Sequence, residues 1–206
     1  MDILDSLEKH KELLVLIVAT IGGAFALWRW MVDQKWRRVQ HAQSLVEKFL
    51  EKRNTIKAFE ILDTIGEVEC ASKYDVKKNE TINITDEFLI GALSTFDQKK
   101  ENDESEIIIR DIFDDFFDDL STFQGHIESG LIKLQDIKPY LEYWMSELAG
   151  HGRIRGTDFA DQVGRYLNYF RFERTLTLAR SMGHPFNVLN SVVETHMAGI
   201  NPATKM

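Results

Sequence analysis

The chain contains few residues that form cross-links or interrupt helices. Its one cysteine, Cys70, cannot form a disulfide within the chain, which fits a reducing compartment. Only three prolines occur among 206 residues, and neither glycine nor proline lies between Ala24 and Arg53. That stretch is therefore expected to be one uninterrupted helix.

The sequence also lacks recognisable catalytic motifs. It contains no P-loop, no G-x-S-x-G and no H-E-x-x-H string. Its six histidines show no metal-ligand spacing, and no cysteine and histidine suggest a nucleophilic pair. We expect no metal and no cofactor, and we favour a non-enzymatic function.

One uncharged run lies near the start of the chain. Residues 13–28 read LLVLIVATIGGAFALW, without charge or proline. A hydrocarbon core about 30 Å thick needs about 20 helical residues, which the run reaches if Arg29 extends its charge to the interface. We predict an extracytoplasmic N-terminus over 1–12, a transmembrane helix over 13–32 and a cytoplasmic α-helical domain over 33–206.

Aromatic and basic residues cluster at the end of the predicted span. Tryptophan and arginine are enriched at membrane interfaces, and those expected there are Trp28, Arg29, Trp30, Trp36, Arg37 and Arg38. The basic residues after the span outnumber Lys9 and Lys11 before it. This imbalance places the domain on the cytoplasmic side.

Two other interpretations of the apolar segment stay open. Ala24-Phe25-Ala26 resembles a signal-peptide cleavage site, although a signal peptide opens with a basic region and residues 1–12 are mixed in charge. A buried core helix usually shows a polar stripe, whereas Thr20 is the only polar residue between Leu13 and Leu27. We therefore favour the membrane anchor.

Small residues recur four positions apart within the span. They are Ala19 with Gly23, and Gly22 with Ala26. This spacing lets transmembrane helices approach closely, so it predicts packing between subunits. Simple exposure to lipid is the alternative.

Helical periodicity continues beyond the span. A helix from Leu13 to Arg53 would be roughly 60 Å long, with half of it projecting into the cytoplasm. Further helices are predicted at about 55–65, 86–98, 104–125, 136–149, 157–182 and 186–198, with Pro139 and Pro185 in first turns. A short hairpin within 68–85 is the only sheet suggested. The expected fold class is all-α.

The densest charge cluster lies in the predicted helix 104–125, where aspartates and phenylalanines occupy opposite faces. The aspartates considered for a site are Asp114, Asp115, Asp118 and Asp119. Their spacing matches the DDxxD string with which isoprenoid synthases hold magnesium diphosphate, but no second acidic motif is visible. A generic divalent-ion site is another interpretation. We favour a structural interpretation, in which the phenylalanine stripe faces the core and the aspartates form the acidic outer face of the same helix.

A segment whose basic residues are all arginine follows. Between Glu101 and Glu147 there are thirteen acidic residues, whereas between His151 and Arg180 there are three. The arginines considered for a site are Arg153, Arg155, Arg165, Arg171 and Arg174. Arginine favours bidentate partners. These side chains are expected either to pair with the acidic helix, within or between subunits, or to bind phosphate of RNA, a nucleotide or lipid.

Arg180-Ser-Met-Gly-His184 is similar to the R-x-x-x-x-H signature of HEPN ribonucleases, one residue shorter. In that class the histidine acts as acid or base and the arginine contacts the phosphate. Gly183 and Pro185 favour a helix terminus instead.

The overall layout resembles a family of small membrane-anchored bacterial helical proteins of unknown function. The segments that carry the resemblance are the span, the basic helix around Trp36, the stretch Phe113 to Gly130 and Tyr140-Leu-Glu-Tyr-Trp144. The layout is also similar to the membrane accessory protein of type VI-B CRISPR systems. That resemblance implies a HEPN-like domain, a ring-shaped pore in the bacterial inner membrane and a role in antiviral defence.

The leading hypothesis is a non-enzymatic, oligomeric inner-membrane effector or accessory protein, pore-forming or membrane-perturbing in antiviral defence. Its expected partners are the bilayer, further copies of the chain and a CRISPR or other defence component, with nucleotide or RNA at the arginine segment. One alternative is a HEPN-like ribonuclease or nucleotide-sensing membrane protein that uses Arg180 and His184. Another is a membrane scaffold that recruits a soluble partner.

Overall fold

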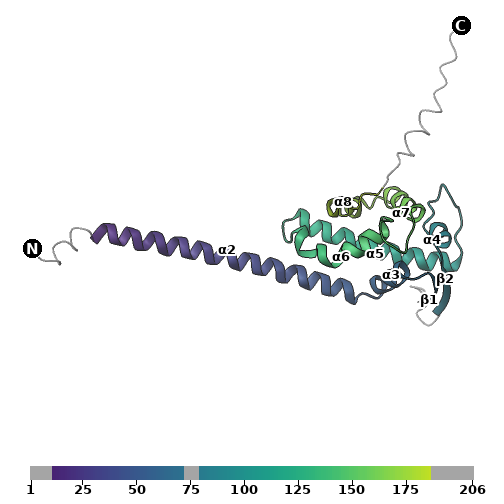
Figure 1. Ribbon diagram of the computed structural model, residues 1–206, viewed down its shortest axis with the longest axis horizontal. Coiled ribbons are helices and arrows are strands. Elements are labelled where there is room, and N and C mark those ends of the chain that lie inside the picture. Colours follow the sequence, from purple (N-terminus) through teal and green to yellow (C-terminus); the bar gives the residue numbers. More distant parts are fainter. Residues whose placement is uncertain (1–10, 72–78, 187–206) are drawn as a thin grey trace, which may run out of the picture.

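One helix of 41 residues, α2, runs from Lys11 to Glu51 and extends well beyond the rest of the molecule (Figure 1). The structure is a computed structural model that describes residues 11–71 and 79–186. The uninterrupted helix predicted from Ala24 to Arg53 is present up to Glu51, and Arg53 begins the next helix.

The rest of the described chain forms a mainly helical domain with one small sheet. Its elements are α3 (Arg53–Asp63), β1 (Gly66–Ala71), β2 (Asn79–Ile84), α4 (Asp86–Ala92), α5 (Glu104–Glu128), α6 (Leu134–Leu148), α7 (Thr157–Tyr169) and α8 (Glu173–Met182). The helices predicted near 55, 104 and 136 are confirmed with small shifts of their ends. The mostly helical fold is as expected.

The second half of α2 belongs to the core of this domain. Ala42, Val46 and Phe49 are buried, and their spacing places them on one face of the helix. The ring of Phe49 stacks on Phe116 at a centroid distance of 5.8 Å and meets the edge of Phe123 at 5.1 Å. The helical periodicity predicted beyond the span is present in this part of α2, and its apolar stripe packs into the domain.

Helix α5 is the centre of the domain and contacts α3, α4, α8 and β1. It begins with a capping box, in which the Asp103 carboxylate accepts the Glu106 N–H and the Glu106 carboxylate accepts the Asp103 N–H. Its core-facing residues are Phe113, Phe116, Phe117 and Leu120, all fully buried. The predicted phenylalanine stripe is confirmed.

The two strands form an antiparallel hairpin in which Val68 pairs with Ile82 and Cys70 with Glu80. Val68, Cys70, Ile82 and Ile84 are buried, while Glu67, Glu69, Thr81 and Asn83 between them are exposed, so each strand alternates between core and solvent. The predicted hairpin is therefore present. Burial also raises the pKa of the Cys70 thiol to about 11.

The single helix predicted over 157–182 is wrong, because the chain breaks between α7 and α8. Arg171 adopts φ 65°, a left-handed conformation that no helix interior accepts. On either side of it, Phe170 packs on Tyr166 and Phe172 on Phe117. Residues two apart point to different sides of a helix, so the break allows both rings to reach the core.

Two other boundaries differ from the prediction, and a third predicted helix is not covered by the described residues. Helix α4 ends at Ala92, because the Gln98 side chain accepts the N–H and hydroxyl of Thr95 and folds the next segment into a turn. Pro139 lies in the second turn of α6, which begins earlier than predicted. The helix predicted over 186–198 falls, apart from Phe186, outside the described residues.

Candidate functional site

The first half of α2 exposes a long apolar surface. It is the one helix of the described chain that is long and apolar enough to cross a membrane, and none of its apolar stretch is buried against the rest of the protein. Val18 and Ile21 are 69% and 64% exposed. Within this chain, the segment is not the core helix considered as an alternative.

The small residues of the span face open space. A Cβ atom added at Gly22 or Gly23 would meet no atom within 4 Å. Ala19 and Ala26 are exposed as well. These positions therefore have no packing role inside the single chain.

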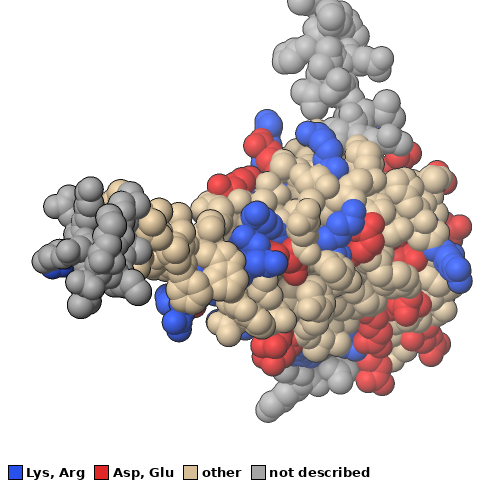
Figure 2. Space-filling view, turned by 60° about the vertical axis from the view of Figure 1, so that its left-hand side comes forward, with Lys and Arg blue, Asp and Glu red and all other residues tan. Residues whose placement is uncertain are grey.

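The predicted interface residues surround α2 just before it enters the domain. Trp28, Trp30 and Trp36 are all more than half exposed, and Arg29 is exposed beside them. Arg37 pairs with Asp33 one turn away, at 2.8 Å between Nε and Oδ2. In Figure 2, tan atoms predominate along the exposed part of α2, and blue side chains mark the approach to the domain.

Arg38 has a second role that the sequence did not reveal. Its Nε lies 3.0 Å from Oδ2 of Asp136, and both side chains are largely buried. The same Asp136 oxygen accepts the Lys133 N–H at 2.9 Å, at the start of α6. One carboxylate thus caps α6 and fixes α2 to it.

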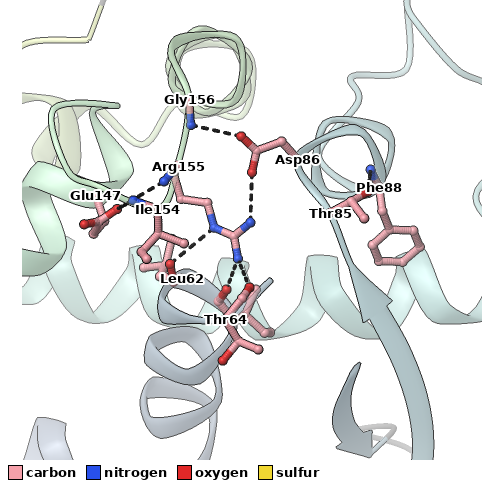
Figure 3. Close-up of polar contacts among 10 residues, drawn as sticks. Leu62, Thr64, Thr85, Asp86, Phe88, Glu147, Ile154, Arg155 and Gly156 are labelled. Atoms are coloured by element: carbon pink, nitrogen blue, oxygen red, sulfur yellow. Dashed lines mark hydrogen bonds and ion pairs between the residues drawn. The ribbon is translucent and has the colours of Figure 1, made fainter. Parts of the chain in front are cut away.

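Arg155, expected to bind a ligand or a second subunit, is instead a buried structural residue (Figure 3). Its guanidinium donates to the carbonyl oxygens of Ile61, Leu62 and Thr64 at the end of α3. It also pairs with Asp86 at 2.8 Å. A cation at a helix C-terminus satisfies carbonyl groups that lack partners in the helix, so this interaction joins α3 to α4.

The backbone beside Arg155 is held by a buried carboxylate. Glu147 accepts the N–H groups of Arg153, Ile154 and Arg155 at 2.9, 3.1 and 3.2 Å. A Cβ atom at Gly152 would lie 2.1 Å from this carboxylate, so only glycine fits there. The sequence showed the glycines of this loop but not the carboxylate that requires one of them.

The remaining arginines do not form one site. Arg153, Arg165, Arg171 and Arg180 are exposed, and Arg174 pairs with Glu128 at 3.0 Å on the surface. Arg171 and Arg174 line a shallow pocket of about 400 Å³ that also includes Asp118. The Arg174 ion pair therefore joins α8 to the end of α5. The other exposed arginines of the segment lie at separate places on the surface.

The aspartates of α5 use several kinds of partner. Asp114 accepts the Tyr166 hydroxyl at 2.6 Å, Asp115 accepts from Asn54, and Asp119 pairs with Lys52. Burial raises the pKa of Asp114, although the Tyr166 hydrogen bond and nearby Arg110 oppose the shift. Over the described residues, no group of three or more histidine, cysteine or carboxylate side chains is placed to hold a metal.

The Arg180 and His184 pair lies at a helix terminus. Gly183 adopts φ 95°, and the His184 N–H donates to the Ala179 carbonyl at 2.9 Å, as in a Schellman motif. The His184 ring contacts Glu142 at 3.1 Å and His151 at 3.3 Å. Arg180 is exposed, and in the described structure no hydrogen bond joins it to His184. The geometry follows the helix-terminus interpretation.

Comparison of the chain with protein-family models, curated proteins and solved structures gave no match.

Proposed function

We propose that this chain is a single-pass protein of the bacterial inner membrane that acts as a non-enzymatic, oligomeric effector or accessory protein. The observation that carries the proposal is the exposed apolar half of α2, whose apolar window is not buried against the rest of the described chain. A soluble monomer rarely exposes an apolar patch of more than a few hundred Å². A bilayer would cover this surface completely.

The interface residues support the proposed orientation. Arg29, Lys35, Arg37 and Arg38 follow the apolar stretch at the end nearer the domain, and positive charge near a span favours the cytoplasmic side. The domain is accordingly proposed to lie in the cytoplasm. The exposed tryptophans would occupy the headgroup layer between the span and the domain.

Self-association is supported by the open surroundings of Gly22 and Gly23. Small residues four apart allow the backbones of two spans to approach, and no residue that the structure describes occupies the space beside Gly22 and Gly23. Pore formation and antiviral defence rest on the resemblance stated for the sequence, together with the single long helix, and stay predictions. An assay of phage infection with and without the gene tests the defence role.

Membrane integration is tested with the full chain in bacterial cells. The protein should stay in the membrane pellet after alkaline carbonate extraction, with the intact mass of 23.9 kDa. Phe25→Asp should release it, because a charge near the centre of a span costs about 2.5–3.5 kcal/mol. Phe96→Asp places the same charge at an exposed phenylalanine of the domain and should have no effect.

Two results would contradict the membrane assignment. One is complete release of the unaltered chain by carbonate. The other is a mature protein shortened near Ala26, which would identify a signal peptide. Protection of the domain from protease added outside the inner membrane would confirm the orientation.

Oligomerisation is tested by light scattering of the detergent-solubilised chain. We expect a defined higher oligomer that weakens when Gly22 and Gly23 are both replaced by leucine, while Ile21→Leu leaves it unchanged. A clean monomer would contradict the oligomeric effector and leave the membrane scaffold. Loss of biological activity in His184→Ala with unchanged assembly would instead favour the ribonuclease.

A further inference from the structure

Where α2 approaches the domain, an open pocket of about 530 Å³ lies between this helix and the turn that joins α5 to α6. Lys35, Arg37 and Arg38 line it, together with Trp30 and Met31. Leu131 lines it from the turn. The pocket therefore combines cations with large apolar side chains contributed by two separate segments.

The cations of this pocket can accept a further anion. Arg37 and Arg38 pair with Asp33 and Asp136 through Nε, so their terminal nitrogens keep donors for another acceptor. Lys35 is exposed and makes no ion pair with any residue that the structure describes. A phosphate group matches this set of donors.

The apolar residues beside these cations are unusually exposed. Trp30, Met31 and Leu131 have exposed fractions of 58%, 51% and 52%. Leu131 is held in place, because its N–H donates to the His126 carbonyl at 3.0 Å and Gly130 before it adopts φ 73°. A rigid turn thus presents a leucine next to the tryptophan of the neighbouring helix.

The position of the pocket along α2 fits the headgroup layer. Arg38 lies six residues beyond Val32, the end of the predicted span, which is about 9 Å along a helix. The polar layer on each side of a bilayer is about 5–8 Å thick. Lys35, three residues beyond Val32 and about 4.5 Å along the helix, would therefore lie within this layer, and Arg38 would lie at its outer edge.

We propose that this pocket binds the phosphate of an anionic phospholipid headgroup, while Leu131 enters the interface beside it. The inference rests on the proposed membrane integration of α2. Free phosphate would use only the cations, whereas a phospholipid also covers Trp30, Met31 and Leu131. The domain would then contact the membrane surface at two places, through α2 and through the turn after α5 that contains Leu131.

Native mass spectrometry of the full chain in detergent, titrated with phosphatidylglycerol or phosphatidylcholine, tests the proposal. Phosphatidylglycerol should be retained more tightly. Lys35→Gln should weaken its binding about fivefold, the usual contribution of one cation near an anionic headgroup. Leu131→Ser should also weaken it, with the domain's unfolding midpoint unchanged. Arg29→Gln removes the same charge closer to the span but outside the pocket, and should weaken binding less than Lys35→Gln does.

Three outcomes would overturn the inference. Equal weakening by Arg29→Gln and Lys35→Gln would mean diffuse attraction without a pocket. Competition by millimolar inorganic phosphate, with the same sensitivity to Lys35→Gln, would identify a free-phosphate site. Equal retention of the two lipids would mean no headgroup recognition. Carbonate extraction separates these failures from failure of the membrane assignment, because a chain that stays in the pellet can still lack a lipid preference.

Discussion

The two halves of α2 share one unbroken helical backbone but have opposite surroundings. From Val15 to Trp28 the helix is apolar on every side and exposed, whereas beyond Trp36 the residues Ala42, Val46 and Phe49 form a single buried stripe. The backbone does not mark where the domain begins. The change from all-round apolarity to a one-sided stripe does, and it separates a segment that could lie in lipid from one that packs into the protein core.

The largest expected effect tests this division directly. Phe49→Ala removes a buried ring that packs on Phe116 and Phe123, and should lower the free energy of unfolding of the domain by about 3–5 kcal/mol. Phe25→Ala removes the same ring from the exposed half and should leave domain unfolding unchanged. Denaturant titration in detergent, followed by near-ultraviolet circular dichroism, measures both. Equal losses would show that the halves are not independent.

Glycines provide a second, smaller contrast. Gly152→Ala puts a methyl group against the buried Glu147 carboxylate and should cost about 1–3 kcal/mol of domain stability. Gly22→Ala adds the same methyl group in the exposed half, where no atom lies within 4 Å, and should not lower the midpoint. Thermal unfolding of the two variants side by side makes the measurement. A stable Gly152→Ala protein would mean that Glu147 does not hold the loop as described.

The smallest effect is a pH dependence confined to the domain, since residues 13–28 carry no titratable group. The raised pKa of Asp114 means that the folded state binds this proton more tightly than the unfolded chain. Its contribution to stability is therefore present at low pH and lost as the pH rises through the raised pKa. Asp114→Asn keeps an acceptor for Tyr166 without the charge.

The measurement compares unfolding of the unaltered chain and Asp114→Asn from about pH 4 to pH 7. The stability of the unaltered chain, relative to the variant, should decrease as the pH rises. A constant difference across the range would show that Asp114 does not titrate in this window. If the stability of the unaltered chain relative to the variant increased with pH, the pKa of Asp114 would be lowered in the folded state, contrary to the prediction.

Local patterns allowed parts of this molecule to be predicted from sequence. The uninterrupted α2 and the phenylalanine stripe of α5 follow from spacing within one segment, and the hairpin follows from alternation. The break between α7 and α8 was missed by the prediction of one helix over 157–182, although Phe170 and Phe172, two residues apart, could not both face the core from one helix. Local spacing was therefore sufficient where one segment determined its own burial.

The missed residues depend on segments far apart in the sequence. Nothing in the sequence distinguishes Arg155 from the other arginines, and its structural role depends on Asp86, 69 residues away, and on carbonyl groups at the end of α3. Asp136 is likewise 98 residues from Arg38. The apolar run and its interface residues were visible in the sequence, but Leu131 joins them only through the turn after α5.

The continuity of α2 also fixes how the proposed membrane segment is rotated about the helix axis relative to the domain. At about 100° per residue, the face formed by Ala19, Gly22, Gly23 and Ala26 lies roughly 150° around the helix from the stripe of Ala42, Val46 and Phe49. If two spans pack through these small residues, each domain would lie on the side of its own helix that faces away from the other helix. Pairing between spans and pairing between domains must therefore use different sides of the molecule.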